Sequence, residues 1–156
     1  MPRVLIVAYG NPLRCDDGVA WRAADTLQKK FSSDVEILRL HQLAPEVADT
    51  AREFKLVLFV DAACVDDIDN SRAGDVRVRE IYADADCHGP GHFSHVYSPG
   101  RVLDLARELY SATPRAFVIT MAGENFDHGD SLSARVASAL PELIARIEDL
   151  IKESNP

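Results

Sequence analysis

The chain has 156 residues, of which 47% are hydrophobic, and its 25 acidic and 17 basic side chains give a formal net charge of −8. This length and composition predict one globular domain, residues 1–156. The acidic excess argues against a nucleic-acid partner, because phosphate backbones are bound by clustered lysine and arginine. No apolar run is long enough for a bilayer, so no membrane partner is expected.

The first apolar run, residues 4–8, predicts a buried strand, and it leads into a Gly-Asn-Pro loop that ends in two adjacent acids, Asp16 and Asp17. Asp16 is a good N-cap for the helical pattern that follows. Capping would leave Asp17 in the first helical turn, at the carboxyl end of the strand. Open parallel sheets place their ligand sites at this end.

Further apolar runs predict strands at 35–38, 56–60 and 116–120, with helical patterns between and after them. Residues 75–82 alternate charged and apolar side chains, which indicates an antiparallel edge strand with one wet face. The expected fold is therefore α/β: a three-layer sandwich with a mostly parallel twisted sheet, an antiparallel edge strand and helices on both faces.

Proline and serine mark the ends of the predicted helices. Pro45 favours a helix running to about Arg52, and Ser98 before Pro99 is a typical helix start. The last helix is expected over 133–152, with a kink at Pro141, where the chain lacks a backbone donor. Two irregular stretches remain, 65–74 and 83–97, and long loops of this kind are often functional.

Three imidazoles lie in the second of these loops. His88 and His92 have the spacing of a helical metal pair, but the Gly-Pro-Gly sequence between them argues against a helix, and both are interpreted as solvated. His95 differs because apolar and aromatic neighbours can bury and orient it. His95 is therefore a candidate site residue.

Asp61 follows the apolar run 56–60 and is expected at the same edge of the sheet as Asp17, so that two acids would face one crevice. Two carboxylates and the imidazole of His95 can hold a divalent first-row metal with coordination positions left open, although these residue types do not name the metal. An open position would admit water or a substrate group for Lewis-acid chemistry.

Several short motifs follow one another along the chain: Gly10-Asn11-Pro12-Leu13, Asp16-Asp17-Gly18-Val19, His41-Gln42-Leu43-x-Pro45-Glu46, Asp61 and Ser94-His95. In these motifs the chain resembles the hydrogenase maturation endopeptidases, almost throughout its length. It departs from the family at Cys15 and Ala20, where glycine is usual. An α/β fold with a twisted sheet between helices is implied.

The resemblance also implies an activity: removal of a short C-terminal extension from the precursor of a nickel-iron hydrogenase large subunit after nickel insertion. Asp17, Asp61 and His95 match the family's metal-contacting residues and are the expected catalytic and metal-binding residues. On this analogy nickel arrives with the substrate and serves as the recognition element, so no permanently bound cofactor is expected. The general base stays open, with Asp16 a candidate only if it is not the helix cap.

Other functions are compatible with parts of the sequence. A cysteine hydrolase would pair Cys15, Cys64 or Cys87 with His95, and a nickel carrier would bind the metal without cutting. A phospho-acceptor signalling domain is disfavoured, because no lysine follows the last predicted strand. The three cysteines, an odd number without C-x-x-C spacing, fit a reducing cytoplasm, and the first apolar run is not typical of a secretory signal.

Two further features of the sequence have structural interpretations. Trp21 is interpreted as a core residue or a contact between helix and sheet. Glu124, Asn125 and His128 follow the last predicted strand and are interpreted as solvated turn residues, with a role in lining the substrate cleft as the alternative.

Overall fold

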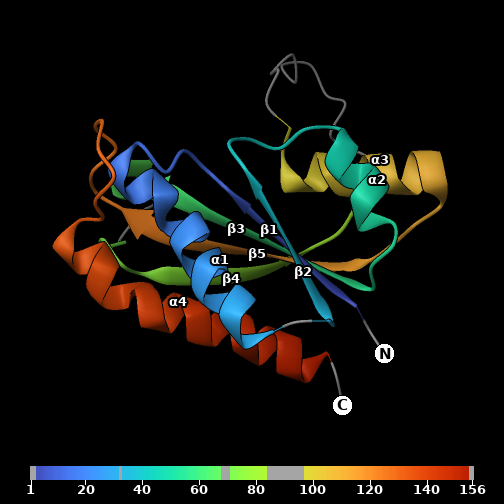
Figure 1. The fold of residues 1–156 in the computed structure, drawn as a ribbon. Helices are drawn as coiled ribbons and strands as arrows, with labels where there is room; N and C mark the ends of the chain where they lie inside the picture. Colours follow the sequence, from blue (N-terminus) through green and yellow to red (C-terminus); the bar gives the residue numbers. More distant parts are fainter. Residues whose placement is uncertain (1–2, 32, 68–70, 84–96, 155–156) are drawn as a thin grey trace.

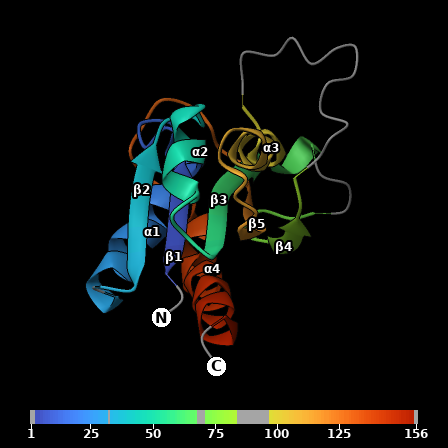
Figure 2. The same cartoon turned by 90° about the vertical axis from the view of Figure 1, so that its right-hand side faces the viewer.

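The computed structural model describes residues 3–31, 33–67, 71–83 and 97–154. In these residues one sheet has the strand order β2-β1-β3-β5-β4, which Figure 2 shows from left to right. Its parallel strands are β1 (Val4–Tyr9), β2 (Val35–Leu40), β3 (Leu56–Cys64) and β5 (Arg115–Gly123), and β4 (Val76–Ile81) pairs antiparallel with β5 at the edge. The predicted edge strand is thus confirmed.

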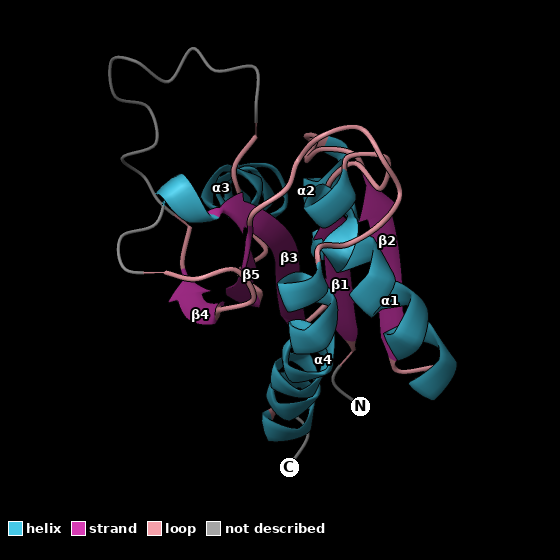
Figure 3. Cartoon of the chain, turned by 90° about the vertical axis from the view of Figure 1, so that its left-hand side faces the viewer, coloured by secondary structure: helices cyan, strands magenta, loops and turns pink. Residues whose placement is uncertain are grey.

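Helices cover both faces of the sheet. On one face lie α1 (Val19–Lys30) and α4 (Ala134–Glu153), and on the other lie α2 (Glu46–Ala51) and α3 (Pro99–Tyr110) (Figure 1). Figure 3 shows α1 and α4 side by side in front of the strands. The predicted three-layer sandwich is confirmed. None of the described helices has both the length and the apolar character needed to cross a bilayer.

The central strands are apolar on both sides because each side meets a helical layer. Ile6, Leu58 and Ile119 belong to the core cluster under α1 and α4. Val7 and Phe59 belong to the cluster under α2 and α3. The alternation of side chains therefore assigns each strand residue to one of the two layers.

The strand β3 is longer than its apolar run. The prediction that it ends before Asp61 is wrong: pairing with β5 continues to Cys64, and Asp61 lies opposite Thr120. The apolar run marks where both faces are covered by helices, whereas the strand ends where backbone pairing ends. The backbone of Asp61 is therefore fixed by the pairing of β3 with β5, and the residue does not lie on a loop.

The boundaries of α2, α3 and α4 lie close to those predicted from the sequence. Ser98 caps α3, with its Oγ accepting from the N–H of Arg101 at 3.1 Å. Pro45 is the residue before α2 rather than its first residue. A short 3-10 helix, Val65–Asp67, lies in the first irregular stretch. Pro141 lies inside α4, which is continuous across it.

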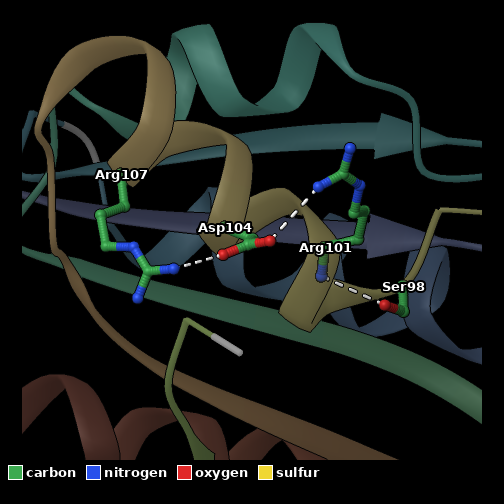
Figure 4. A network of polar contacts seen from close by, with 4 residues as sticks. All are labelled: Ser98, Arg101, Asp104 and Arg107. Carbon is green, nitrogen blue, oxygen red and sulfur yellow. Dashed lines mark hydrogen bonds and ion pairs between the residues drawn. The ribbon is translucent and has the colours of Figure 1, made fainter. Parts of the chain in front are cut away.

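The carboxylate of Asp104, in the middle of α3, forms ion pairs with two arginines of the same helix (Figure 4). Asp104 is fully buried and pairs with Arg101 at 3.2 Å and with Arg107 at 2.7 Å, one helical turn away on either side. A charge removed from water must be paired and hydrogen-bonded. The two guanidinium groups meet that need while keeping partial contact with solvent.

Candidate functional site

The loop after β1 folds tightly around Asp17. The backbone N–H of Asn11 donates to Asp17 Oδ2 at 2.8 Å. Gly10 has φ of +143°, and a Cβ there would lie 2.1 Å from the carbonyl oxygen of Asp17. Only glycine allows this approach of the two backbone segments. Gly10 and Asn11 therefore determine where Asp17 stands at the carboxyl edge, the edge of the sheet at which the parallel strands end.

Asp16 has a different role from the predicted one. The residue that precedes α1 is Gly18, and no side chain caps that helix. Asp16 instead lies with Asp17 in a short 3-10 helix, Cys15–Gly18, and is fully buried. Its carboxylate accepts four hydrogen bonds, from Glu124 N at 2.9 Å, Asn125 N at 3.0 Å, Ser133 N at 2.8 Å and Ser133 Oγ at 2.9 Å.

The prediction of Asp16 as an N-cap is thus wrong, because its donors come from residues more than 100 positions later in the chain. Four donors at 2.8 to 3.0 Å satisfy the buried charge without a cation. Asp16 is also a candidate, from the sequence, for the general base of the reaction. Because its carboxylate is fully buried, it cannot take a proton from a water molecule at the surface of the site, and we do not assign it that role.

Further hydrogen bonds beside Asp16 join the loop after β1, which carries Asp16 and Asp17, to the loop after β5. Cys15 N donates to Gly129 O at 2.9 Å, and Gly129 N donates to Leu13 O at 2.9 Å. Arg14 Nε donates to the carbonyl of Phe126 at 3.1 Å. The loop that carries Asp17 is therefore fixed to the loop after β5 and does not depend on local contacts alone.

Asp61 faces the layer formed by α2 and α3, on the same side of the sheet as Phe59. Burial and the negative charge of Asp17 raise the pKa of Asp61 from its ordinary value of 3.8 to about 7. Hydrogen bonds from the N–H of Ala62 and the hydroxyl of Tyr9 oppose this shift. The structure therefore brings Asp17 and Asp61 together, while their roles stay a prediction.

Tyr9 is the hydrogen-bond donor to Asp61. Burial first, and then the charge of the Asp61 carboxylate and the hydrogen bond to it, raise the pKa of Tyr9 above its ordinary value. The phenol therefore stays protonated at neutral pH, and its O–H donates a hydrogen bond to the Asp61 carboxylate.

His95 lies outside the described residues, as do His88, His92 and Cys87. Within the part of the chain that the structure describes, no three His, Cys, Asp or Glu side chains are grouped as a metal site. That part supplies two of the three predicted ligands. The helix α3, which begins four residues after His95, covers the face of the sheet on which Asp61 lies.

Several solved structures with the same fold carry the names of hydrogenase maturation proteases, whereas no protein-family model and no curated protein sequence matches the chain. The hydrogenase maturating endopeptidase HybD from E. coli aligns with a TM-score of 0.77 and 18% identity, over 98% of this chain and 94% of that one. The chain has the fold of the hydrogenase maturation endopeptidases.

Two archaeal structures agree with this finding. The [NiFe] hydrogenase maturation protease HybD from Thermococcus kodakarensis has a TM-score of 0.67 and 22% identity, over 95% of this chain and 98% of that one. The protease HycI from the same organism has a TM-score of 0.71 and 20% identity, over 97% and 93%. The predicted family resemblance is thus confirmed in the fold along nearly the whole chain.

The structure also describes Trp21 and the turn after β5, which the sequence analysis singled out. Trp21 is the expected contact between helix and sheet: its Nε1 donates to the carbonyl of Leu40 at 3.0 Å, and its ring meets that of His41 edge-on at 5.5 Å. Glu124 and His128 are exposed, as expected of turn residues. The backbone of this turn, through Asn125 N, also holds Asp16.

Cys15 and Cys64 lie within the described residues, where both are free thiols. Cys15 is buried with φ of +48°, and its Sγ lies against Gly129. Cys64 is half-buried, with Sγ 4.0 Å from Asp66 Oδ2. The positive φ at position 15 favours glycine, which is the residue that the resemblance leads one to expect there.

Tyr9 and Ser133 are residues that the sequence reasoning missed. Tyr9 ends the first apolar run and has the parity of Leu5 and Val7, so it belongs to the α2 and α3 face. This parity was a usable signal, but pairing with Asp61 also requires β1 and β3 to be neighbours. Ser133 carries no local signal of its bond to Asp16.

Proposed function

We propose that this protein is an endopeptidase that removes the C-terminal extension from the precursor of a nickel-iron hydrogenase large subunit after nickel insertion, in the cytoplasm. The observation that carries the proposal is the pair Asp17 and Asp61, brought together at the carboxyl edge of this particular fold. Three solved structures that share the fold are named as hydrogenase maturating endopeptidases or maturation proteases, and this supports the proposal.

In the proposed reaction the precursor supplies nickel, and the enzyme has no resident metal cofactor. Asp17, Asp61 and His95 contact the nickel, since carboxylate and imidazole donors suit divalent first-row metals. A site with only these ligands binds free metal weakly but can recognise a metal already held by thiolates of another protein. Cleavage then follows nickel insertion and does not precede it.

The charge of the site suits this order of events. With a pKa of about 7, part of Asp61 is protonated at neutral pH when Asp17 is its neighbour. Nickel with an open coordination position accepts carboxylate oxygens, and such a contact favours the charged form of Asp61. The nickel-loaded precursor therefore offers the two acids a metal contact that the nickel-free precursor lacks. With nickel docked on the acids, the scissile carbonyl is positioned for attack by water.

The test is mass spectrometry of the large-subunit precursor, from the organism that encodes this chain, after incubation with the protein in nickel-loaded and nickel-free forms. Shortening at the C-terminus of the loaded form alone supports the proposal. No shortening of a precursor with verified nickel content, or equal shortening of both forms, contradicts it.

Single substitutions assign the residues within this assay. Asp17→Asn, Asp61→Asn and His95→Ala should each slow processing by about 100-fold or more, because loss of a direct metal contact should cost more than loss of an outer partner, for which about 10- to 100-fold is typical. The matched control is Asp127→Asn, an exposed aspartate in the loop after β5. Tight binding of free nickel without cleavage would indicate a carrier, and loss of activity on thiol alkylation a cysteine hydrolase.

A further inference from the structure

Tyr9 and Asp61 are neighbours across two parallel strands. The pairing of β1 with β3 ends at Ala8 opposite Val60, so the next residue of each strand is Tyr9 and Asp61. Side chains alternate between the two faces of a sheet. Tyr9 lies two residues after Val7 and Asp61 two residues after Phe59, so both face α2 and α3. Their juxtaposition follows from the sheet itself and needs no loop to maintain it.

The hydroxyl of Tyr9 donates to the carboxylate of Asp61, and the backbone N–H of Ala62 donates to it as well. A carboxylate offers about four lone-pair positions. The terminal torsion of aspartate is broad, with no sharp rotamer wells, so external partners must hold the plane of the carboxylate. Two donors from the sheet hold it and leave acceptor positions for other groups.

We infer that Tyr9 is a positioning residue that orients the Asp61 carboxylate for contact with the metal of the substrate. The inference rests on the proposed function. Groups behind a metal ligand fix its orientation, and their loss typically lowers metal affinity or activity by about 10- to 100-fold. Tyr9 is such a group, because it donates a hydrogen bond to the proposed ligand Asp61. Its backbone is fixed in the central strand β1.

The variant Tyr9→Phe tests the inference, because it keeps the half-buried ring and removes only the hydroxyl. We expect kcat/KM for the nickel-loaded precursor to fall by about 10- to 100-fold. Affinity for the nickel-loaded precursor should fall in the same range, while affinity for the nickel-free precursor stays unchanged. A merely structural defect would weaken both affinities alike, so their ratio is the deciding quantity.

Tyr82→Phe is the matched control. Tyr82 is 72% exposed and follows β4 at the opposite edge of the sheet, where Ile81 pairs with Ala116. Removal of its hydroxyl should leave both affinities and kcat/KM as in the unmodified protein. The inference is overturned if Tyr9→Phe binds and cleaves the loaded precursor normally, or if it loses affinity for both precursors equally.

The two levels of the proposal fail separately. If the unmodified protein does not shorten the precursor, or Asp61→Asn shortens it at full rate, the proposed function fails. If Asp61→Asn is impaired while Tyr9→Phe is not, only the role of Tyr9 fails. Thermal unfolding of each variant shows whether the folded population is the same in all of them.

Discussion

Ser133 donates two hydrogen bonds to Asp16, from its N–H at 2.8 Å and from its Oγ at 2.9 Å, and thereby joins the start of α4 to the loop beside Asp17. Asp16 is fully buried. One carboxylate therefore connects two distant parts of the chain at the carboxyl edge. The neighbouring Asp17 instead accepts from the N–H of Asn11 in its own loop.

Asp16→Asn should destabilise the protein by about 3 kcal/mol. The amide cannot accept at both of its terminal atoms, so buried N–H groups around it lose their acceptor. Urea unfolding measures the change, and Ser133→Ala, which removes one of the four bonds, should cost about 1 kcal/mol. The exposed Asp127→Asn serves as control and should stay within about 0.5 kcal/mol. An Asp16→Asn midpoint equal to that of the control would contradict this account of the buried carboxylate.

Gly10→Ala should be destabilising and should also displace Asp17. Its Cβ would stand 2.1 Å from the carbonyl oxygen of Asp17, at a φ of +143° that suits glycine alone. We expect a loss above about 1 kcal/mol in unfolding free energy, measured by urea unfolding.

The control for this change is Gly100→Ala. Gly100 lies in the first turn of α3, and the nearest atom to its added Cβ is Ser98 Oγ at 4.0 Å. Alanine there should stabilise by about 0.5 kcal/mol, because glycine is the poorer helix former. Equal effects of the two substitutions on unfolding would refute the steric argument at Gly10.

The pH dependence of stability should contain a contribution from Asp61. Its pKa in the folded protein is raised to about 7, so between about pH 4 and pH 7 the folded state binds more protons than the unfolded chain. Stability from this group is therefore fully present at low pH and falls as the pH rises toward 7. Because a tenfold change in proton affinity corresponds to about 1.4 kcal/mol, the total is at most about 4 kcal/mol.

Asp61→Asn removes this contribution, and its unfolding free energy relative to the unmodified protein should rise as the pH increases from about 4 to about 8. Asp17→Asn should reduce the effect, because it removes the negative charge that helps to raise the pKa of Asp61. Urea unfolding across this range provides the measurement. Parallel pH curves for Asp61→Asn and the unmodified protein would show that the pKa of Asp61 is not raised.

Asp104→Asn should cost about 2 kcal/mol in unfolding free energy. It weakens the charge-assisted bonds from Arg101 and Arg107 at a fully buried position while keeping the side-chain volume. Thermal or urea unfolding measures the change. Asp149→Asn, an exposed aspartate in α4, makes the same chemical change at the surface and should have little effect. A similar small effect at Asp104 would mean that the ion pairs merely offset their own desolvation.

The sequence by itself determined the order of the main strands and helices and the layers that they form, but not every boundary. Apolar runs identified the parallel strands, the alternation in β4 identified an antiparallel edge, and Ser98 identified the start of α3. These signals are local, since periodicity and capping depend on residues a few positions apart. For the same reason the sequence placed Asp17 and Asp61 at one edge of a sheet.

Only the tertiary structure decided what each acid contacts. A local rule assigned Asp16 to a helix cap, but the donors that satisfy it come from Ser133 and the loop after β5. The strand order places Tyr9 beside Asp61, and no spacing along the chain encodes that order. A hydrogen bond between distant segments depends on how the whole sheet is assembled, so the sequence indicated the site but not the partners that hold it.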